Sequence, residues 1–285
     1  MTDMPQVFPM TNIGGLDVSR MIIGTNAFYG ASHISKGRDE WLRRYFTPER
    51  IYEVVAAAAE EGINALLAGP SPELKSVLEE LERNTGRHVH YIATPAGMDL
   101  EQLRPGIDLA ADLGCEFCWP HQTFTDNRLV VSDNCILDAP EALALIRQRG
   151  MIPGWSTHRP ETVVVTDRAG YDCEGYLQIF NAAGFMCAVE TDWVATVIRQ
   201  AQKPVVVIKP LGSGRLMPIT ALPFVYSNIK PTDTVAVGFM SPEEAREDIE
   251  IARQCVAQGG VAPDIELQYT RSKESLLPRG AASGH

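Results

Sequence analysis

The sequence lacks any apolar run approaching the roughly 20 residues that cross a bilayer as a helix, and it is poor in basic residues. Its 285 residues include 25 Lys and Arg against 36 Asp and Glu, which gives a formal net charge of −11. Nucleic acids and anionic membrane surfaces are bound by basic faces that release counterions. We therefore expect no nucleic acid and no membrane partner, and we expect a small-molecule substrate; a homo-oligomer stays open.

The sequence also lacks a cysteine framework. Its 6 cysteines are scattered along a long chain, unlike the dense spacing of a small disulfide-bonded domain. Cys115 and Cys118 have the C-x-x-C spacing of a redox or metal pair, but no second pair exists, and a strand would direct their side chains to opposite faces. The amino terminus has no basic segment followed by an apolar run. We expect reduced thiols and a cytoplasmic location.

Hydrophobic residues make up 45% of the chain, enough for one large core, and they follow a regular alternation. Short apolar runs alternate with segments whose apolar positions recur at i, i+3 and i+4 and which mostly end in glycine. The runs predicted to be strands are 21–25, 63–69, 89–95, 116–122, 151–158, 176–181, 205–208 and 234–240. The sixth strand has an alternative at 184–189, and either choice leaves eight strands.

Eight strands alternating with helices within about 250 residues predict an α/β fold, a closed (β/α)8 TIM barrel. We expect a single domain at 1–277 and a disordered tail at 278–285. A turn at Gly14–Gly15 is predicted to close a small hairpin with VFPM at 7–10. The connection at about 26–46 is much longer than the usual stretch of about 2 to 6 residues, and we expect it to act as a lid over the pocket.

The chain is organised around PVVVIKPLGSGRL at 204–216. Val205–Ile208 is predicted to be a strand buried on both faces, because a half-exposed strand would alternate with polar residues. Lys209 therefore stands at the carboxyl end of a core strand. Gly212 and Gly214 follow, where backbone amides can approach a ligand closely. Because ligands gather at the strand carboxyl ends of such barrels, a binding site is predicted here.

Seven further features occur in an order that is familiar from one enzyme superfamily. They are VSRMIIGTNAFYG near the start, AEEGIN before the second strand, His121 closing the fourth, GWST closing the fifth, YLQIFN as the sixth, KPLGSGRL after the seventh, and VGFMSPEEAREDIE at the end. Together they resemble the aldo-keto reductase superfamily over most of the chain. The resemblance implies that family's barrel, with a tyrosine, an aspartate, a lysine and a histidine held near a nicotinamide.

The sequence departs from this pattern at most of the reductase positions. His121 matches the family's histidine, but Ala68 stands where the aspartate is expected and Pro95 where the lysine is expected. The family's tyrosine has no counterpart. Ile208 replaces the aromatic residue that stacks on the nicotinamide, and Glu247–Asp248 puts acidic groups where a phosphorylated ribose would lie. We therefore expect NADPH binding to be lost.

Two histidines, a carboxylate and a lysine remain on the carboxyl face of the predicted barrel. His121 and His158 end neighbouring strands and Glu190 begins a helix, so the three can converge on a divalent ion such as Zn²⁺ or Mn²⁺. Lys209 would act as acid, base or electrostatic clamp. The residues predicted to contact the substrate are Asn26, Gln122, Ser156, Asn181 and Arg215. The competing structural roles are a core histidine for His121, a cap or surface residue for His158, and a helix-dipole carboxylate for Glu190.

The expected function is an enzyme with a reductase-like barrel that has lost NADPH-dependent reduction. It would act as a lyase, isomerase or hydrolase on a small polar carbonyl or hydroxylated, sugar-like substrate, with or without a metal ion. Three alternatives stay open. They are a divergent NAD(P)H-dependent aldo-keto reductase, an aldolase-like lyase that forms a Schiff base through Lys209, and a non-catalytic barrel that binds a small ligand.

Overall fold

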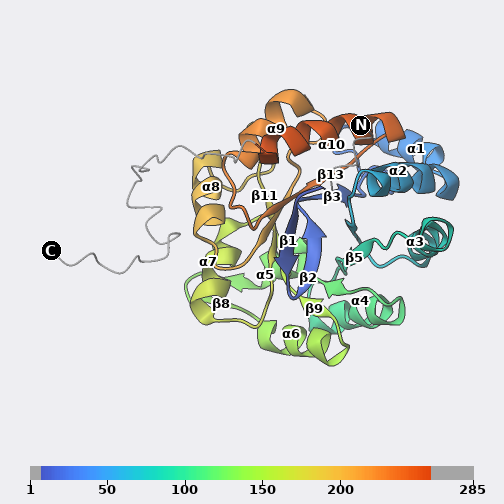
Figure 1. The fold of residues 1–285 in the computed structure, drawn as a ribbon. Helices are drawn as coiled ribbons and strands as arrows, with labels where there is room; N and C mark the ends of the chain where they lie inside the picture. The colour runs from blue at the N-terminus through green and yellow to red at the C-terminus, as the bar shows by residue number, and fades with distance from the viewer. Residues whose placement is uncertain (1–7, 258–285) are drawn as a thin grey trace.

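The computed structural model describes residues 8–257, and its centre is a closed sheet of parallel strands (Figure 1). The strands are β3 (Met21–Gly24), β4 (Ala65–Ala68), β5 (His90–Ala93), β6 (Phe117–Cys118), β9 (Ile152–Pro153), β10 (Trp155–Thr157), β11 (Tyr176–Ile179), β12 (Val205–Ile208) and β13 (Thr234–Val237). They pair in the order β10-β11-β12-β13-β3-β4-β5-β6-β9. Since only Gly154 separates β9 from β10, these two are halves of one strand, and the sheet closes into a barrel with eight strand positions.

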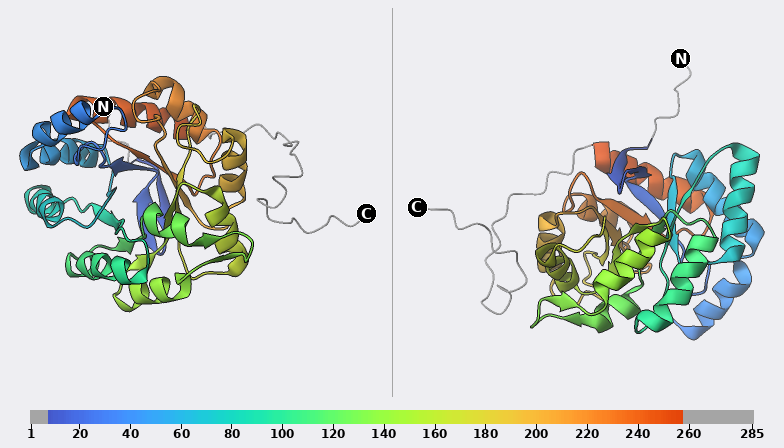
Figure 2. Two further views of the ribbon diagram at one scale, coloured as in Figure 1. Left: turned by 180° about the vertical axis from the view of Figure 1, so that it is seen from behind. Right: turned by 90° about the horizontal axis from the view of Figure 1, so that it is seen from below.

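Helices surround this sheet, as the two further views show (Figure 2). They are α1 (Lys36–Tyr45), α2 (Pro48–Glu60), α3 (Pro72–Thr85), α4 (Leu100–Asp112), α5 (Gln122–Arg128), α6 (Ala139–Gln148), α7 (Pro160–Ala169), α8 (Thr191–Gln200), α9 (Pro218–Tyr226) and α10 (Pro242–Ala257). Local chemistry explains their ends. The side chains of Thr47 and Ser71 accept backbone N–H groups at the starts of α2 and α3, as capping residues do. Gly86 ends α3 in the left-handed conformation, which glycine adopts without steric cost.

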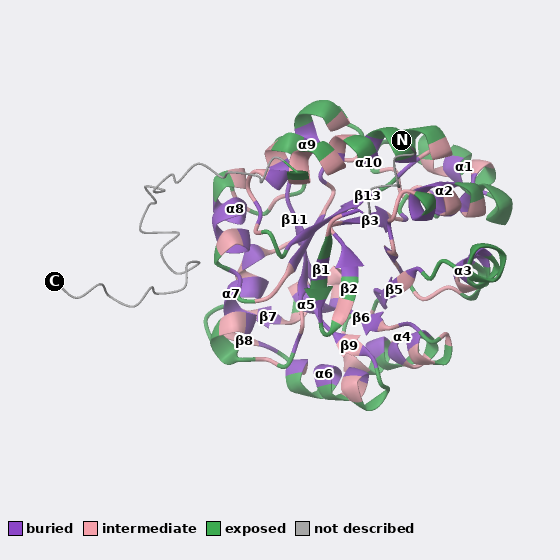
Figure 3. Ribbon diagram, in the orientation of Figure 1, coloured by how far each residue is buried: buried purple, intermediate pink, exposed green. Residues whose placement is uncertain are grey.

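The barrel interior is a separate apolar cluster that the amino-terminal hairpin closes. Strand β1 (Met10–Ile13) pairs with β2 (Leu16–Ser19), and Ile13 and Val18 are fully buried against residues of the barrel strands such as Ile22. Because β2 leads almost directly into β3, this hairpin covers the amino-terminal end of the barrel. Burial is concentrated in the sheet and on the inner faces of the helices (Figure 3). The opposite end of the barrel is therefore the one available to a ligand.

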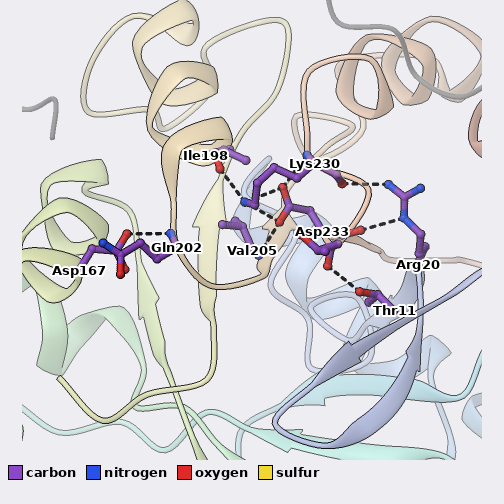
Figure 4. A network of polar contacts seen from close by, with 9 residues as sticks. Thr11, Arg20, Asp167, Ile198, Gln202, Val205, Lys230 and Asp233 are labelled. Carbon is purple, nitrogen blue, oxygen red and sulfur yellow. Dashed lines mark hydrogen bonds and ion pairs between the residues drawn. The ribbon is translucent and has the colours of Figure 1, made fainter. Parts of the chain in front are cut away.

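A polar network ties the amino-terminal ends of several strands together (Figure 4). The buried carboxylate of Asp233 accepts hydrogen bonds from the backbone N–H groups of Val205 and Lys230, at 2.8 and 2.7 Å. The Lys230 amine donates to the carbonyl of Ile198 at 2.7 Å. Arg20, just before β3, donates to the Asp233 carbonyl at 3.1 Å. These bonds satisfy a buried charge and fix the strand ends to each other.

The predicted barrel is confirmed, and the structure resolves the choice of the sixth strand. Tyr176–Ile179 forms β11, whereas 184–189 contains no strand. The Asn181 side chain hydrogen-bonds both the backbone N–H and the carbonyl of Phe185, so the chain turns back where the alternative strand would begin. The predicted hairpin forms, and it pairs 10–13 with 16–19. Residue 7, where the expected hairpin began, lies outside the described residues.

The ends of the predicted domain and one short strand pair complete the comparison with the sequence. The tail expected at 278–285 and the boundary at 277 lie outside the described residues. A short antiparallel pair, β7 (Leu129–Val130) with β8 (Cys135–Ile136), was not expected. Within residues 8–257, no helix is both long and apolar enough to cross a membrane.

Candidate functional site at the carboxyl ends of the strands

Lys209 is the first residue after β12, and it lies at the mouth of the barrel in a strained conformation. Its φ is 56°, in the left-handed region that non-glycine residues occupy at an energetic cost. The amine lies 2.7 Å from Nε2 of His33. Burial lowers the pKa of Lys209 to about 8, because desolvation disfavours the ammonium form. The site thus contains an amine that is partly neutral near physiological pH.

The loop after Lys209 is held in place by Arg215. Gly212 and Ser213 both have a φ of 56°. The Arg215 guanidinium donates to the carbonyls of Gly212 and His33, at 3.0 and 3.1 Å, and lies over the ring of Phe185 at 4.0 Å. Arg215 therefore connects the loop after β12 with the long connection after β3 and the loop after β11.

His121 caps α5 through its imidazole. Its Nδ1 accepts the backbone N–H of Thr123 at 3.3 Å, so the neutral ring carries its proton on Nε2. Burial, and secondarily the positive charge of Lys209, lower the pKa of His121. His121 is thus a neutral hydrogen-bond donor at neutral pH, and the structural role of a hydrogen-bonded histidine that the sequence left open is also present.

His158 follows β10 and is positioned by Asp126 of α5. The Asp126 carboxylate accepts the backbone N–H of His158 at 3.1 Å and the hydroxyl hydrogen of Thr157. Burial lowers the pKa of His158 to about 4, and the charges of Lys209, His121 and His33 add to this effect. The three imidazoles and the amine all follow the carboxyl ends of barrel strands, so they share one end of the barrel.

The other residues predicted for the site range from fully buried to exposed. Asn181 is fully buried and both ends of its amide are bonded to the backbone of Phe185, so its first role is to hold the turn. Ser156 is buried within β10. Gln122 is the half-buried first residue of α5, and Asn26 is exposed at the start of the long connection. Glu190 is the exposed residue that precedes α8 and makes no side-chain cap bond there.

The three predicted metal ligands do not converge in this structure. Among the described residues, one group of His, Cys, Asp or Glu side chains brings three ligand atoms within 4.8 Å of one another, and it consists of His88, His90 and Glu116. These residues stand at the start of β5 and just before β6, which is the amino-terminal end of the barrel. His121, His158 and Glu190 are not such a group.

Sequence reasoning missed the roles of three residues near the mouth. His33 lies in the connection recognised as unusually long, but only the folded chain shows that it contacts Lys209. Asp126 had no signal, because its partner is a backbone group 32 positions away. A third residue, Tyr29, brings its phenol close to the side chains of Ser71 and Tyr91. Partial burial raises the pKa of Tyr29.

The cysteine pair has no reactive character. Cys118 is fully buried in β6, and Cys115, in the connection between α4 and β6, is also buried. Burial raises the pKa of Cys115 to about 12 and also raises that of Cys118. Both thiols are therefore protonated at neutral pH, which suits packing rather than redox or metal chemistry.

Comparison with known proteins shows a likeness in fold alone. No family model matches the chain, and no curated protein matches it. Among solved structures, it is similar to a putative aldo-keto reductase from Pseudomonas aeruginosa, with a TM-score of 0.65, 18% identity, and coverage of 90% of this chain and 100% of that one. An aldo-keto reductase from a Medee basin deep-sea metagenome library gives a TM-score of 0.53 and 9% identity, with coverage of 92% and 98%.

A further likeness is to an enzyme of a different kind. Ribulose-1,5-bisphosphate carboxylase/oxygenase from Pyrococcus horikoshii gives a TM-score of 0.51 and 13% identity, covering 74% of this chain and 54% of that chain. All three neighbours are enzymes. At these identities the likeness establishes the barrel, so the activity has to be argued from the side chains at the mouth.

Proposed function

We propose that this aldo-keto-reductase-like barrel is an enzyme that moves protons on a small carbonyl or hydroxylated substrate, as a lyase or isomerase, without hydride transfer. The observation that carries the proposal is Lys209. Its amine has a pKa lowered to about 8 and lies against His33 at 2.7 Å. A general base or acid works best when its pKa lies near the operating pH.

The neighbouring groups supply complementary roles. His121 offers an Nε2–H donor, which can hold the negative oxygen of an enolate or alkoxide. His158 is neutral at physiological pH because its pKa is lowered to about 4, so it polarises or positions the substrate without adding charge. Lys209 takes the proton beside the carbonyl in its neutral form and returns it as the ammonium.

The backbone strain at the site supports a functional role for Lys209. Lys209, Ser213 and His33 all have a φ near 55°, and all three lie in the two segments that meet over the mouth. Each such residue costs on the order of 1–3 kcal/mol, and strained residues persist where the surrounding structure holds them for function. A lysine that only reached solvent would not need this conformation.

The test is proton exchange without added cofactor. The chain is incubated in D2O with a panel of small hydroxyketones, hydroxyaldehydes and 2-keto acids, and loss of the proton beside the carbonyl is followed by NMR. We expect exchange with at least one compound, and a loss of at least about 100-fold in Lys209→Met, the range of general acid–base catalysis. Lys203→Met, at the other end of the same strand, should keep the activity.

The same samples separate the Schiff-base alternative. Borohydride reduction followed by mass spectrometry would show a Lys209 adduct if an iminium forms. Exchange without an adduct supports acid–base catalysis by the amine. No exchange with any compound, together with retained binding of one of them, would favour the non-catalytic barrel and contradict the proposal.

A divergent reductase is the second candidate, because one observation favours it. The phenol of Tyr29 lies close to Ser71. Ser71 follows the strand after which the family's tyrosine is expected, so a tyrosine from another segment stands near that position. Fluorescence titration with NADPH tests this candidate. Binding in the micromolar range, with carbonyl reduction that is lost in Tyr29→Phe, would make the reductase the leading function.

The proposal assigns no metal ion to the mouth. His121, His158 and Glu190 do not bring their ligand atoms together, and Nδ1 of His121 is occupied by a backbone N–H. A metal-assisted reaction at the mouth would require these side chains to rearrange. Elemental analysis of the purified chain and of His121→Ala tests it, since a mouth-bound ion would be lost in that variant.

A further inference from the structure

We propose that His88, His90 and Glu116 form a zinc site at the amino-terminal end of the barrel, separate from the mouth. The three offer ligand atoms within 4.8 Å of one another. His88 and His90 are two positions apart on the extended segment that enters β5, so their side chains lie on the same face. The imidazole rings are 4.9 Å apart between centroids.

The third ligand comes from the neighbouring strand. Strand β5 pairs with β6, with Ile92 opposite Phe117, which places Glu116 beside the two histidines. Its Oε1 lies 2.6 Å from Nε2 of His88 and 3.5 Å from Nδ1 of His90. Ligands about 2.0–2.2 Å from a tetrahedral Zn²⁺ are themselves about 3.3–3.6 Å apart. Oε1 of Glu116 and Nδ1 of His90 already have this separation. Oε1 of Glu116 and Nε2 of His88, now joined by a hydrogen bond, would move apart to it when the ion replaces the shared proton.

The groups around these three residues are those of a metal centre. His88 Nδ1 bonds the carboxylate of Glu82 on α3 at 3.2 Å, an arrangement that fixes the imidazole so that Nε2 faces the ion. The other oxygen of Glu116, Oε2, accepts the backbone N–H of Tyr91 at 2.9 Å. This bond holds the carboxylate and leaves Oε1 for the ion.

His90 provides an independent indication. Its Nδ1 is buried and makes no hydrogen bond in the structure, although it points toward Oε1 of Glu116. A buried polar atom without a hydrogen bond is unfavourable, and an ion bound between the two groups would satisfy it. Since 42% of the His88 side chain is exposed, an ion can enter from solvent.

The ligand chemistry selects the metal and the role. Two imidazoles and one carboxylate suit Zn²⁺ better than Mg²⁺ or Ca²⁺, which prefer oxygen ligands. With Glu82 nearby, two carboxylates neutralise the charge of the ion. The site lies at the end of the barrel that is associated with stability rather than catalysis, and it would join β5, β6 and α3. It is therefore a stabilising site, open to one water ligand.

The experiment is metal binding by the full chain after chelator treatment and dialysis. Calorimetric titration with Zn²⁺ should give one ion per chain at micromolar or tighter affinity and a higher melting temperature. Co²⁺ should give the visible absorption of a tetrahedral complex. His90→Ala and Glu116→Gln should each lose at least about 30-fold in affinity, and Glu82→Gln about 10-fold, the effect expected for a group that orients a ligand.

The control is His158→Ala, at the other end of the barrel, which should bind Zn²⁺ as the unchanged protein does. If His90→Ala fails to fold, the more exposed His88→Gln tests the same ligand set. Unchanged Zn²⁺ affinity in these variants, or loss of binding in His158→Ala alone, would overturn the proposal. So would the absence of any micromolar binding by the unchanged protein.

Discussion

At the scale of single residues, the mouth is defined by charges that the fold has partly desolvated. Lys209 and His158 both have a lowered pKa, first because of burial. Among the described residues, no carboxylate contributes to either shift, so none of them offsets the cost of the cationic form. Both groups therefore favour their neutral forms more than they do in water.

The first prediction is the titration of Lys209. Reductive methylation with ¹³C-formaldehyde labels the lysine amines and the α-amino group, whose own pKa is about 8. NMR should show one lysine resonance that titrates near pH 8, since burial lowers the pKa of Lys209 to about 8. This resonance should be absent in Lys209→Arg, which identifies it. If every lysine titrates with the ordinary pKa of about 10.4, the basis of the proposed acid–base role is wrong.

The second prediction concerns Asp248, a buried residue of α10. Burial, and then the charges of Glu244 and Glu247, raise the pKa of Asp248 to about 7. Because the folded pKa lies above the unfolded value of about 3.9, folding takes up a proton between these two pH values. The free energy of unfolding therefore falls as the pH rises from about 4 to 7.

Replacing this carboxyl should remove the pH dependence. Asp248→Asn should be more stable than the unchanged protein by about 1–2 kcal/mol near pH 8 and equal to it near pH 4, since nearby solvent offsets part of the full shift. Urea unfolding at both pH values measures this. Glu79→Gln, an exposed change on α3, is the control, and a gain of the same size in both variants would contradict the assignment.

At the scale of elements, the long connection after β3 is attached to the mouth by His33. It contains α1 (Lys36–Tyr45), whose Trp41 stacks on Tyr45 at 4.7 Å and is 39% exposed. His33 joins this segment to the loop after β12 through Lys209 and Arg215. Apart from Leu42, the residues of α1 are half-buried or exposed, and a segment of this kind opens at lower cost than the barrel core.

The third prediction is that this segment acts as a lid. His33→Ala should raise the rate of proteolysis within 26–46 about 5-fold, because losing one partly exposed, charge-assisted bond costs about 1 kcal/mol. A ligand that occupies the mouth should slow cleavage and change the fluorescence of Trp41. Ile34→Ala, which changes a mostly exposed side chain, is the matched control. If no ligand that occupies the pocket alters either signal, the segment is not a lid.

At the scale of the whole molecule, barrel closure depends on one tight contact. Gly154 separates β9 from β10, and a Cβ built there would lie 2.5 Å from the ring of Trp119 and 2.7 Å from the carbonyl oxygen of Gly175. Trp119 is fully buried in the barrel interior. Glycine at this position lets the strand pass close to the indole and complete the sheet.

The fourth prediction follows from this contact. Gly154→Ala should lower the free energy of unfolding by about 3 kcal/mol, the upper part of the range for overpacking a core. Gly69→Ala, where a Cβ would meet nothing within 4 Å, should change it little. Chemical denaturation measures both. An equal effect of the two substitutions would show that closure tolerates a larger residue at 154.

Much of the fold could be predicted because its signals are local. Buried strands such as Val205–Ile208 are continuous apolar runs, and glycine or capping residues mark the helix ends, so eight alternating units were recognisable. The fifth strand was predicted whole, although it is broken at Gly154. The sixth strand was ambiguous. The hydrogen bonds of the Asn181 side chain turn the chain after β11, and such bonds produce no periodic pattern in the sequence.

In the candidate site too, features set by local sequence were predictable, and contacts between distant segments were not. The sequence by itself determined that Lys209 would stand at the end of a core strand and that His121 and His158 would end neighbouring strands, since the apolar pattern fixes which residues follow each strand. Only the tertiary structure decided that His33 reaches Lys209, and that the histidines able to share a metal ion are His88 and His90 with Glu116. These contacts join segments distant in the chain, and their distances depend on how the closed sheet and its loops pack, which no local pattern encodes.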